Sequence, residues 1–200
     1  MNAVPQLPVP PASSYREAHL SLMKALEPSR AFCAWVNAPF GPVFLAKTAK
    51  GVCRVSFRRS EDELLSELER RSLFPEMAPG KLERERRELG EYFEGRRRRF
   101  DLPVDLRWGT EFQRRVLGAA RRIPFGGLSS YAEVARRVGH PKAQRAVGSA
   151  LGRNPVAIVI PCHRVVASGG GIGGYTGGLD IKRTLMAIEG IELDSPGRTR

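Results

Sequence analysis

The spacing of the apolar residues changes near position 105, and this change limits the folds open to the chain. Between positions 32 and 57 these residues come in short runs, and the turn-forming residues that break the runs are Pro39, Gly41, Pro42 and Gly51. Such a pattern indicates two or three antiparallel strands joined by tight turns. Beyond position 105 the spacing becomes helical. A chain of 200 residues with both patterns is expected to form two small units that share an interface.

A helix is predicted directly after the strands. Ser60 stands three residues before Glu63, which is the pattern of a capping box. The apolar residues that follow at helical spacing are Leu64, Leu65 and Leu68. Strands followed by a helix make a small α/β unit.

A highly charged segment follows at residues 81–99, and its apolar residues on one possible helical stripe are Leu82, Leu89, Tyr92 and Phe93. The segment ends in four consecutive arginines, Arg96, Arg97, Arg98 and Arg99. This run could bind phosphate, or it could be a solvent-exposed helix end that leads into a linker. The second interpretation is the more common one for such runs.

Three short helices are predicted beyond the linker. The first begins after Thr110, and the second covers residues 131–138 after a serine cap at position 129 or 130. The third covers residues 142–151, with Pro141 in its first turn. Two short helices about a glycine-containing turn fit a helix-turn-helix, whose second helix enters DNA.

These patterns predict an α/β (α+β) fold. A small amino-terminal unit with an antiparallel sheet plus helix precedes a mainly helical carboxy-terminal unit with a helix-turn-helix DNA-binding motif and an active-site loop. The proline-rich start favours an extended, partly flexible leader over residues 1–30. The amino-terminal α/β domain is expected over 31–104, the carboxy-terminal domain over 105–193 and a short tail over 194–200.

Charge and cysteine content narrow the partners and the compartment. The formal net charge is +12 and both halves are basic, so a polyanionic partner is plausible. Three cysteines without repeated spacing do not make a disulfide framework, which favours a reducing, cytoplasmic setting. The longest apolar stretch, residues 156–160, is far shorter than the ~20 residues that span a bilayer.

The apolar stretch at residues 156–160 predicts a buried strand that leads into Cys162 and His163. A cysteine at a strand end, followed at once by histidine, is a candidate activated thiol. Adjacent side chains on an extended chain point to opposite sides, so proton transfer between them needs a bridging water or a turn. Taken alone, a Cys-His pair is more often a buried structural cysteine beside an incidental histidine.

The surrounding sequence resembles the signature of the O6-alkylguanine-DNA alkyltransferases. The matching segments are Asn154-Pro155, residues 161–166 (PCHRVV), residues 173–178 (GGYTGG), Lys182 and Glu189-Gly190, and upstream residues 109–113, Ser130-Tyr131 and residues 145–148. The resemblance is close over about residues 105–191. Residues 30–104 resemble the family's ribonuclease H-like amino-terminal domain by pattern only.

The resemblance implies a set of catalytic roles. Cys162 would accept the alkyl group in a single in-line displacement, with guanine as the leaving group. An activating relay would pass from the cysteine through a water to His163 and on to Glu189, because a carboxylate behind an imidazole fixes its tautomer and strengthens it as a base. Asn154 would shape the turn that carries the cysteine, and Tyr131 would help to rotate the nucleotide and donate to the departing guanine.

The resemblance also implies contacts with DNA. Arg145 would fill the gap left in the duplex when the damaged base swings out. The glycine-rich residues 169–178 would form the pocket wall, with Tyr175 and Thr176 at the guanine. The other residues implied at substrate or DNA are Gly173, Ser130, Ala146 and Lys182. The expected partner is double-stranded DNA that contains O6-alkylguanine, and O4-alkylthymine is a possible second lesion. The protein is expected to be a monomer.

No cofactor is expected. The glycine-rich segment lacks the Gly-Lys-Ser/Thr ending of a phosphate-binding loop, which argues against a nucleotide cofactor. Cys33, Cys53 and His19 are too sparse for a four-ligand metal site. Because a thioether product is stable, each molecule is expected to react once, as a suicide enzyme.

Two rival functions remain at this point. Alkyltransferase-like proteins flip damaged bases without repairing them, but they lack the acceptor cysteine that Cys162 supplies. A Cys-His hydrolase would act on peptides or amides. Against it, the sequence shows no evident set of groups that would stabilise an oxyanion, and a hydrolase would leave the helix-turn-helix unexplained.

Overall fold

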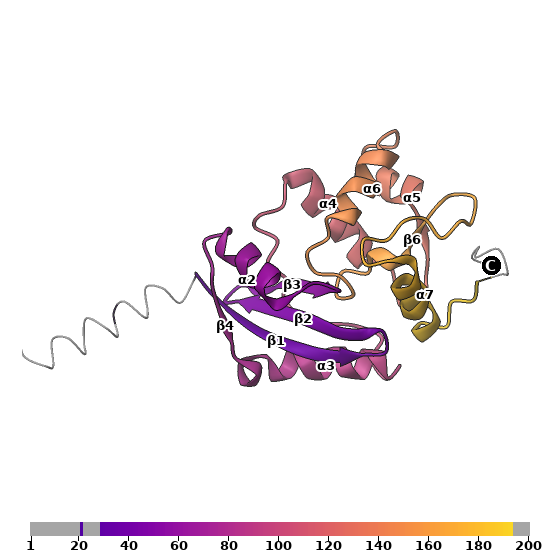
Figure 1. The fold of residues 1–200 in the computed structure, drawn as a ribbon. Helices are drawn as coiled ribbons and strands as arrows, with labels where there is room; N and C mark the ends of the chain where they lie inside the picture. The colour runs from indigo at the N-terminus through magenta and orange to yellow at the C-terminus, as the bar shows by residue number, and fades with distance from the viewer. Residues whose placement is uncertain (1–20, 22–28, 194–200) are drawn as a thin grey trace, which may run out of the picture.

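The computed structural model describes residue 21 and residues 29–193, whose arrangement is shown in Figure 1. Most of the expected leader, the whole expected tail and His19 lie outside the described residues. Within the described part of the chain, no helix is long and apolar enough to cross a membrane.

Four strands form the main sheet in the order β3-β2-β1-β4. β1 (Arg30–Ala38), β2 (Gly41–Thr48) and β3 (Gly51–Phe57) are antiparallel neighbours, as predicted. β4 (Phe74–Met77) runs parallel to β1, so the sheet is mixed and not purely antiparallel. β4 is a four-residue edge strand that contains Pro75, and so short a segment gives no alternating pattern in the sequence.

Helices cover both faces of the sheet (Figure 1). α2 (Glu61–Glu69) begins at the predicted capping box of Ser60 and packs on one face. The short 3-10 helix η2 (Pro79–Leu82) leads into α3 (Glu83–Phe93), which packs on the other face. Residues that alternate along the strands supply the two core layers, and the α3 layer continues into the carboxy-terminal helices.

The outer edge of β3 holds the carboxy-terminal unit against the sheet. The Val52 amide donates to the Pro103 carbonyl at 2.9 Å, and the Val55 amide donates to the Pro155 carbonyl at 2.8 Å. Pro103, which lies before the carboxy-terminal helices, and Pro155, which precedes Cys162, thus accept hydrogen bonds from backbone amides that an edge strand would otherwise leave unpaired. This contact fixes where the cysteine lies relative to the amino-terminal unit.

The carboxy-terminal helices are α4 (Glu111–Arg121), α5 (Tyr131–Arg137), α6 (Gln144–Gly152) and α7 (Leu179–Ile188). α4 begins at the predicted Thr110 cap, and α5 begins at a capping box formed by Ser130. α5 and α6 pack on each other and on α4, and form the predicted helix pair about a turn at Gly139. The strands β5 (Ser129–Ser130) and β6 (Val165–Val166) pair in parallel beside them.

Two local predictions in this unit were wrong. The third helix begins at Gln144 and not at residue 142, because Pro141 lies in a turn closed by a hydrogen bond from the Ala143 amide to the His140 carbonyl. Residues 156–160 are buried as expected, but they form a turn and not a strand. Ile158 has a φ of 72°, and the Ile160 amide donates to the Val156 carbonyl at 2.9 Å. A run of five apolar residues indicates burial and does not distinguish between conformations.

Candidate active site

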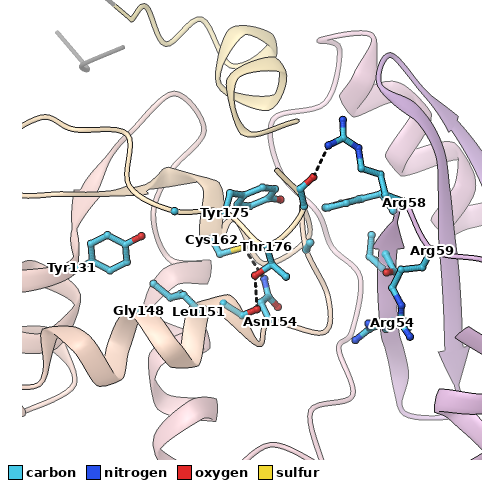
Figure 2. A pocket seen from close by; sticks show the side chains of 17 residues that line it. Arg54, Arg58, Arg59, Tyr131, Gly148, Leu151, Asn154, Cys162, Tyr175 and Thr176 are labelled. Carbon is cyan, nitrogen blue, oxygen red and sulfur yellow. Dashed lines mark hydrogen bonds between the residues drawn. The ribbon is translucent and has the colours of Figure 1, made fainter. Parts of the chain in front are cut away.

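A cleft of about 570 Å³ lies between the two units, with Cys162 in its wall. Figure 2 shows Tyr131 on one side of the cleft and, on the other, Arg54 of β3 with Arg58 and Arg59, which follow that strand. The remaining wall comes from α6 and from residues 174–177. The cleft therefore depends on both units, although the sequence motifs lie in only one of them.

Cys162 is half-buried and opens a 3-10 turn, η3 (Cys162–Arg164). The side-chain amide of Asn154 donates to the cysteine sulfur at 3.2 Å and to the Ile160 carbonyl at 2.9 Å. The Asn154 oxygen accepts from the Val156 amide at 3.0 Å. Asn154 thus closes the turn of residues 156–160 and also touches the thiol (Figure 2).

His163 and Glu189 form a buried pair behind the cysteine. His163 is fully buried, and its Nε2 atom lies 2.7 Å from the Glu189 Oε1 atom. The pairing places the imidazole proton on Nε2 and leaves the Nδ1 lone pair free to accept a proton. Nδ1 has no hydrogen-bond partner in the described part of the chain. Cys162 and His163 are consecutive residues of the 3-10 turn, and the first lines the cleft while the second is buried beside Glu189.

Three further groups hold the Glu189 carboxylate. The Tyr92 hydroxyl donates to it at 2.7 Å, Arg164 donates from Nε at 2.8 Å, and the Gly126 amide donates at 3.1 Å. Burial raises the pKa of Glu189, but the hydrogen bonds from His163 and Arg164 outweigh it and bring the pKa down to about 2. The carboxylate is therefore charged at neutral pH and orients both His163 and Arg164.

Burial shifts the pKa values of the Cys162 thiol and of the His163 imidazole. Burial raises the pKa of Cys162 above its usual value, while the Asn154 hydrogen bond and the Lys182 charge oppose the rise. Burial lowers the pKa of His163, against the effect of Glu189. At neutral pH the site therefore holds a thiol and a neutral imidazole, and the thiol needs a base to react.

Lys182 is fully buried in α7 and does not line the cleft. Its ammonium group donates to the Val165 carbonyl at 2.7 Å and to the Ile172 carbonyl at 2.5 Å. Burial lowers its pKa to about 8. Lys182 thus supports the wall from behind and ties the glycine-rich segment to the strand that follows the 3-10 turn.

The glycine-rich segment brings Tyr175 and Thr176 to the cleft, whereas Gly173 is not one of its lining residues. Gly173 has a φ of 71°, and a Cβ atom there would lie 2.9 Å from the Tyr131 hydroxyl oxygen. Tyr175 is half-buried beside Cys162 in Figure 2, and Thr176 donates to the Gly152 carbonyl at 2.6 Å. These contacts close the segment over α5 and α6.

Arg145, Ala146 and Ser130 lie outside the cleft. Arg145 and Ala146 are exposed on α6, and Ser130 caps α5. Arg145 lines a separate shallow hollow with Tyr131 and Gly148, which also belong to the cleft wall. The arginine thus lies at the outer rim, on the helix predicted to enter DNA.

The amino-terminal unit contacts the glycine-rich segment through Phe57 and Arg58. Sequence reasoning did not single out either residue. The Phe57 ring stacks on Tyr175 with centroids 6.1 Å apart. Arg58 donates to the Gly177 carbonyl at 3.2 Å and forms an ion pair with Asp180. Tyr92 and Arg164 were also missed in their roles at Glu189. Their sequence signal was weak, because no local pattern shows which distant carboxylate a side chain will meet.

Gly177→Ala is expected to destabilise the folded chain by about 1–3 kcal/mol, because the added methyl group overpacks the contact between Gly177 and the Phe57 ring. A Cβ atom at Gly177 would overlap the Cε2 atom of Phe57, whereas one at Gly174 meets nothing within 4 Å. Urea denaturation of the two alanine variants provides the comparison. Equal midpoints for Gly177→Ala and Gly174→Ala would show that Phe57 does not pack there.

Two family models match the chain. Residues 32–106 match the ribonuclease-like domain of 6-O-methylguanine DNA methyltransferase, and residues 111–191 match its DNA binding domain. A methylated-DNA–protein-cysteine methyltransferase of Methanosarcina acetivorans is 39% identical over 162 residues, which cover 80% of this chain and 98% of the relative. Its Mycobacterium tuberculosis counterpart is 41% identical over 154 residues, which cover 77% and 89% of the two chains.

Solved structures show the same fold. The crystal structure of the Mycobacterium tuberculosis O6-methylguanine methyltransferase matches with a TM-score of 0.68 at 37% identity. The Mycobacterium tuberculosis OGT in complex with DNA matches with a TM-score of 0.66 at 36% identity. Each match covers 80% of this chain and 92% of the solved one.

Proposed function

Because the chain belongs to the 6-O-methylguanine DNA methyltransferase family, we propose that it moves the alkyl group of O6-alkylguanine in DNA onto the sulfur of its own Cys162. The activity is that of a methylated-DNA–protein-cysteine methyltransferase, which reverses DNA damage directly. The observation that carries the choice of residue is the position of Cys162. This half-buried residue lines a cleft of about 570 Å³, and the residue that follows it, His163, pairs with Glu189.

The thiol is activated by proton transfer to His163. Glu189 holds the imidazole proton on Nε2, so the unpartnered Nδ1 atom is the one that accepts the thiol proton, through a bridging water. The Asn154 amide donates to the sulfur and stabilises the thiolate as it forms. The charge on Lys182 adds to this effect from behind the wall.

The transfer step is a single displacement at the alkyl carbon. The sulfur forms a bond to that carbon while the bond from the carbon to guanine O6 breaks, and the bonding electrons leave with guanine. Guanine then takes up a proton, which Tyr131 in the cleft wall donates. The net change exchanges the thiol proton for the alkyl group, and no oxidant, reductant or cofactor is needed.

The lesion reaches the sulfur by base flipping. A base inside a duplex cannot present its O6 alkyl group to a sulfur in a cleft wall, so the nucleotide must leave the stack. α6 exposes small residues such as Ala146 beside Arg145, so the helix can approach the groove closely. Arg145 at the outer rim fills the vacated space, and Tyr175 and Thr176 enclose the base. We propose that the protein acts on duplex DNA as a monomer in the cytoplasm.

Arg145→Ala is expected to slow repair of a methylated duplex by about tenfold or more, since a filled gap offsets part of an unstacking cost of a few kcal/mol. Reaction with free O6-benzylguanine should change by less than about twofold, because that substrate has no stack to leave. Single-turnover rates on both substrates make the test. Equal losses on the two would contradict the gap-filling role.

Turnover separates this function from a hydrolase. With methylated duplex in excess, transfer is expected to stop at one methyl group per protein molecule, because the thioether is stable. Counting transferred methyl groups against active protein gives the measurement. Repeated turnover, or cleavage of a thioester substrate, would instead favour hydrolysis at the Cys-His pair.

A further inference from the structure

A second hollow of about 1110 Å³ lies where the residues after α3 meet the end of α4. Its cationic and aromatic lining residues are Arg98, Arg99, Phe100, Arg121, Arg122, Phe125 and Arg164. Arg98 and Arg99 belong to the arginine run at the end of the charged segment, which no step of alkyl transfer uses. The hollow therefore calls for a separate explanation.

The hollow is distinct from the catalytic cleft and shares no lining residue with it. Ala157 and Cys162 line the cleft, whereas Ile158 and Pro161 line the hollow. The turn that carries the reactive cysteine is thus a partition between the two spaces. A ligand in the hollow leaves the cysteine accessible.

The charge in the hollow is unbalanced. Five arginines line it against one carboxylate, Asp101. Arg164 is neutralised by Glu189, and Arg99 lies 3.8 Å from Asp101. Arg98 and Arg122 are exposed and form no ion pair within the described residues. Uncompensated positive charge in a concave surface attracts anions strongly, because the field there is focused.

The basic surface continues along α4. Arg122 also lines an adjoining hollow of about 400 Å³, together with Arg114, Arg115 and Arg137. A track of guanidinium groups over two adjoining hollows suits a ligand with several regularly spaced phosphates better than a single anion.

Aromatic rings lie among these charges. Phe100 and Phe125 are half-buried, and the guanidinium carbon of Arg98 lies 5.7 Å from the Phe125 ring centroid. Cationic grooves interleaved with aromatic rings are typical of sites for single-stranded nucleic acid, in which bases pack on the rings. A duplex keeps its bases stacked inside and cannot use such rings.

We propose that this hollow is a binding site for single-stranded nucleic acid, in which Arg98 and Arg122 hold the phosphodiester backbone and Phe125 contacts a base. The site is separate from the lesion cleft and does not take part in the chemistry. It lets the protein bind unpaired strands near a lesion at a surface other than the lesion cleft.

The test is binding of a short fluorescent oligothymidylate, measured by anisotropy over a series of salt concentrations. The double variant Arg98→Glu/Arg122→Glu is expected to bind at least tenfold more weakly. The slope of log affinity against log salt should fall by about 1.4, at ~0.7 for each lost phosphate contact. The matched control Lys81→Glu/Arg86→Glu changes two exposed residues by the same charge and should stay within about twofold of the wild type.

The single-turnover rate with free O6-benzylguanine checks that the double variant is folded, because it is expected to match the wild-type rate. Unchanged oligothymidylate binding by the double variant would overturn the proposal, as would loss of binding through Arg145→Ala alone. Equal competition by polyglutamate at the same charge concentration would overturn it in favour of an acidic protein partner. Failure of alkyl transfer in the wild type would instead strike the proposed function and leave this binding result standing.

Discussion

Glu189→Gln is expected to slow alkyl transfer by about 10²–10⁴-fold and to destabilise the protein by about 3–5 kcal/mol. The glutamine amide cannot stabilise the imidazolium that forms when His163 takes the thiol proton. It also leaves the buried Arg164 guanidinium without a counter-charge, although Arg164 still donates to the Ile123 carbonyl at 2.6 Å. Single-turnover rates on a methylated duplex and denaturant unfolding measure the two effects.

The same substitution should change how stability depends on pH. Glu189 has a folded pKa of about 2 against an ordinary value of 4.5. A depressed carboxyl pKa contributes stability that is complete above pH 4.5 and is lost as the pH falls toward 2. The variant should therefore lose less stability than the wild type across this window.

Glu192→Gln is the matched control for Glu189→Gln, since Glu192 is exposed and lies in the same chain end. It should leave both the rate and the stability unchanged. A folded Glu189→Gln protein that transfers methyl groups at the wild-type rate would remove the carboxylate from the relay. If that variant does not fold, His163→Gln tests the relay without leaving Arg164 unpaired, and it should show a similar loss of rate.

Cys162→Ser is expected to abolish methyl transfer and to leave binding to methylated duplex within about twofold of the wild type. A serine hydroxyl ionises far less readily than a thiol and is a much weaker nucleophile, but it can still accept the Asn154 hydrogen bond. Transfer assays and duplex binding on the same preparation separate the two properties.

Cys33→Ser is the matched control for Cys162→Ser. Burial raises the pKa of Cys33 to about 12, and the residue lies in the core beneath α2. Transfer should therefore continue in this variant. Residual transfer by Cys162→Ser, or its loss in a folded Cys33→Ser protein, would show that another residue accepts the alkyl group.

Local signals predicted much of the fold. The serine and threonine caps at Ser60, Thr110 and Ser130 mark helix starts that the structure reproduces. These caps act through hydrogen bonds within three residues, so the sequence alone reveals them. β4 escaped prediction because its pairing with β1 is long-range and its sequence is too short to show a period.

The site was predictable where it is local and unpredictable where it joins distant segments. Cys162, His163 and Asn154 lie within nine positions of one another, and the motif identifies them together. Tyr92 reaches Glu189 from α3, and Phe57 reaches Tyr175 from β3. Such contacts follow from how the sheet packs against the helices, and no spacing in the sequence encodes them. The apolar residues 156–160 misled because the turn is set by Asn154 and not by their own pattern.

The central claim is tested most directly by peptide mass spectrometry after incubation with duplex DNA that bears one O6-methylguanine. The peptide that contains Cys162 is expected to gain the mass of one methyl group in place of a hydrogen, with fragmentation placing the group on the sulfur. The peptides that contain Cys33 and Cys53 should keep their original masses. A methyl group on either of those cysteines, or an unmodified Cys162 peptide beside repaired DNA, would contradict the assignment.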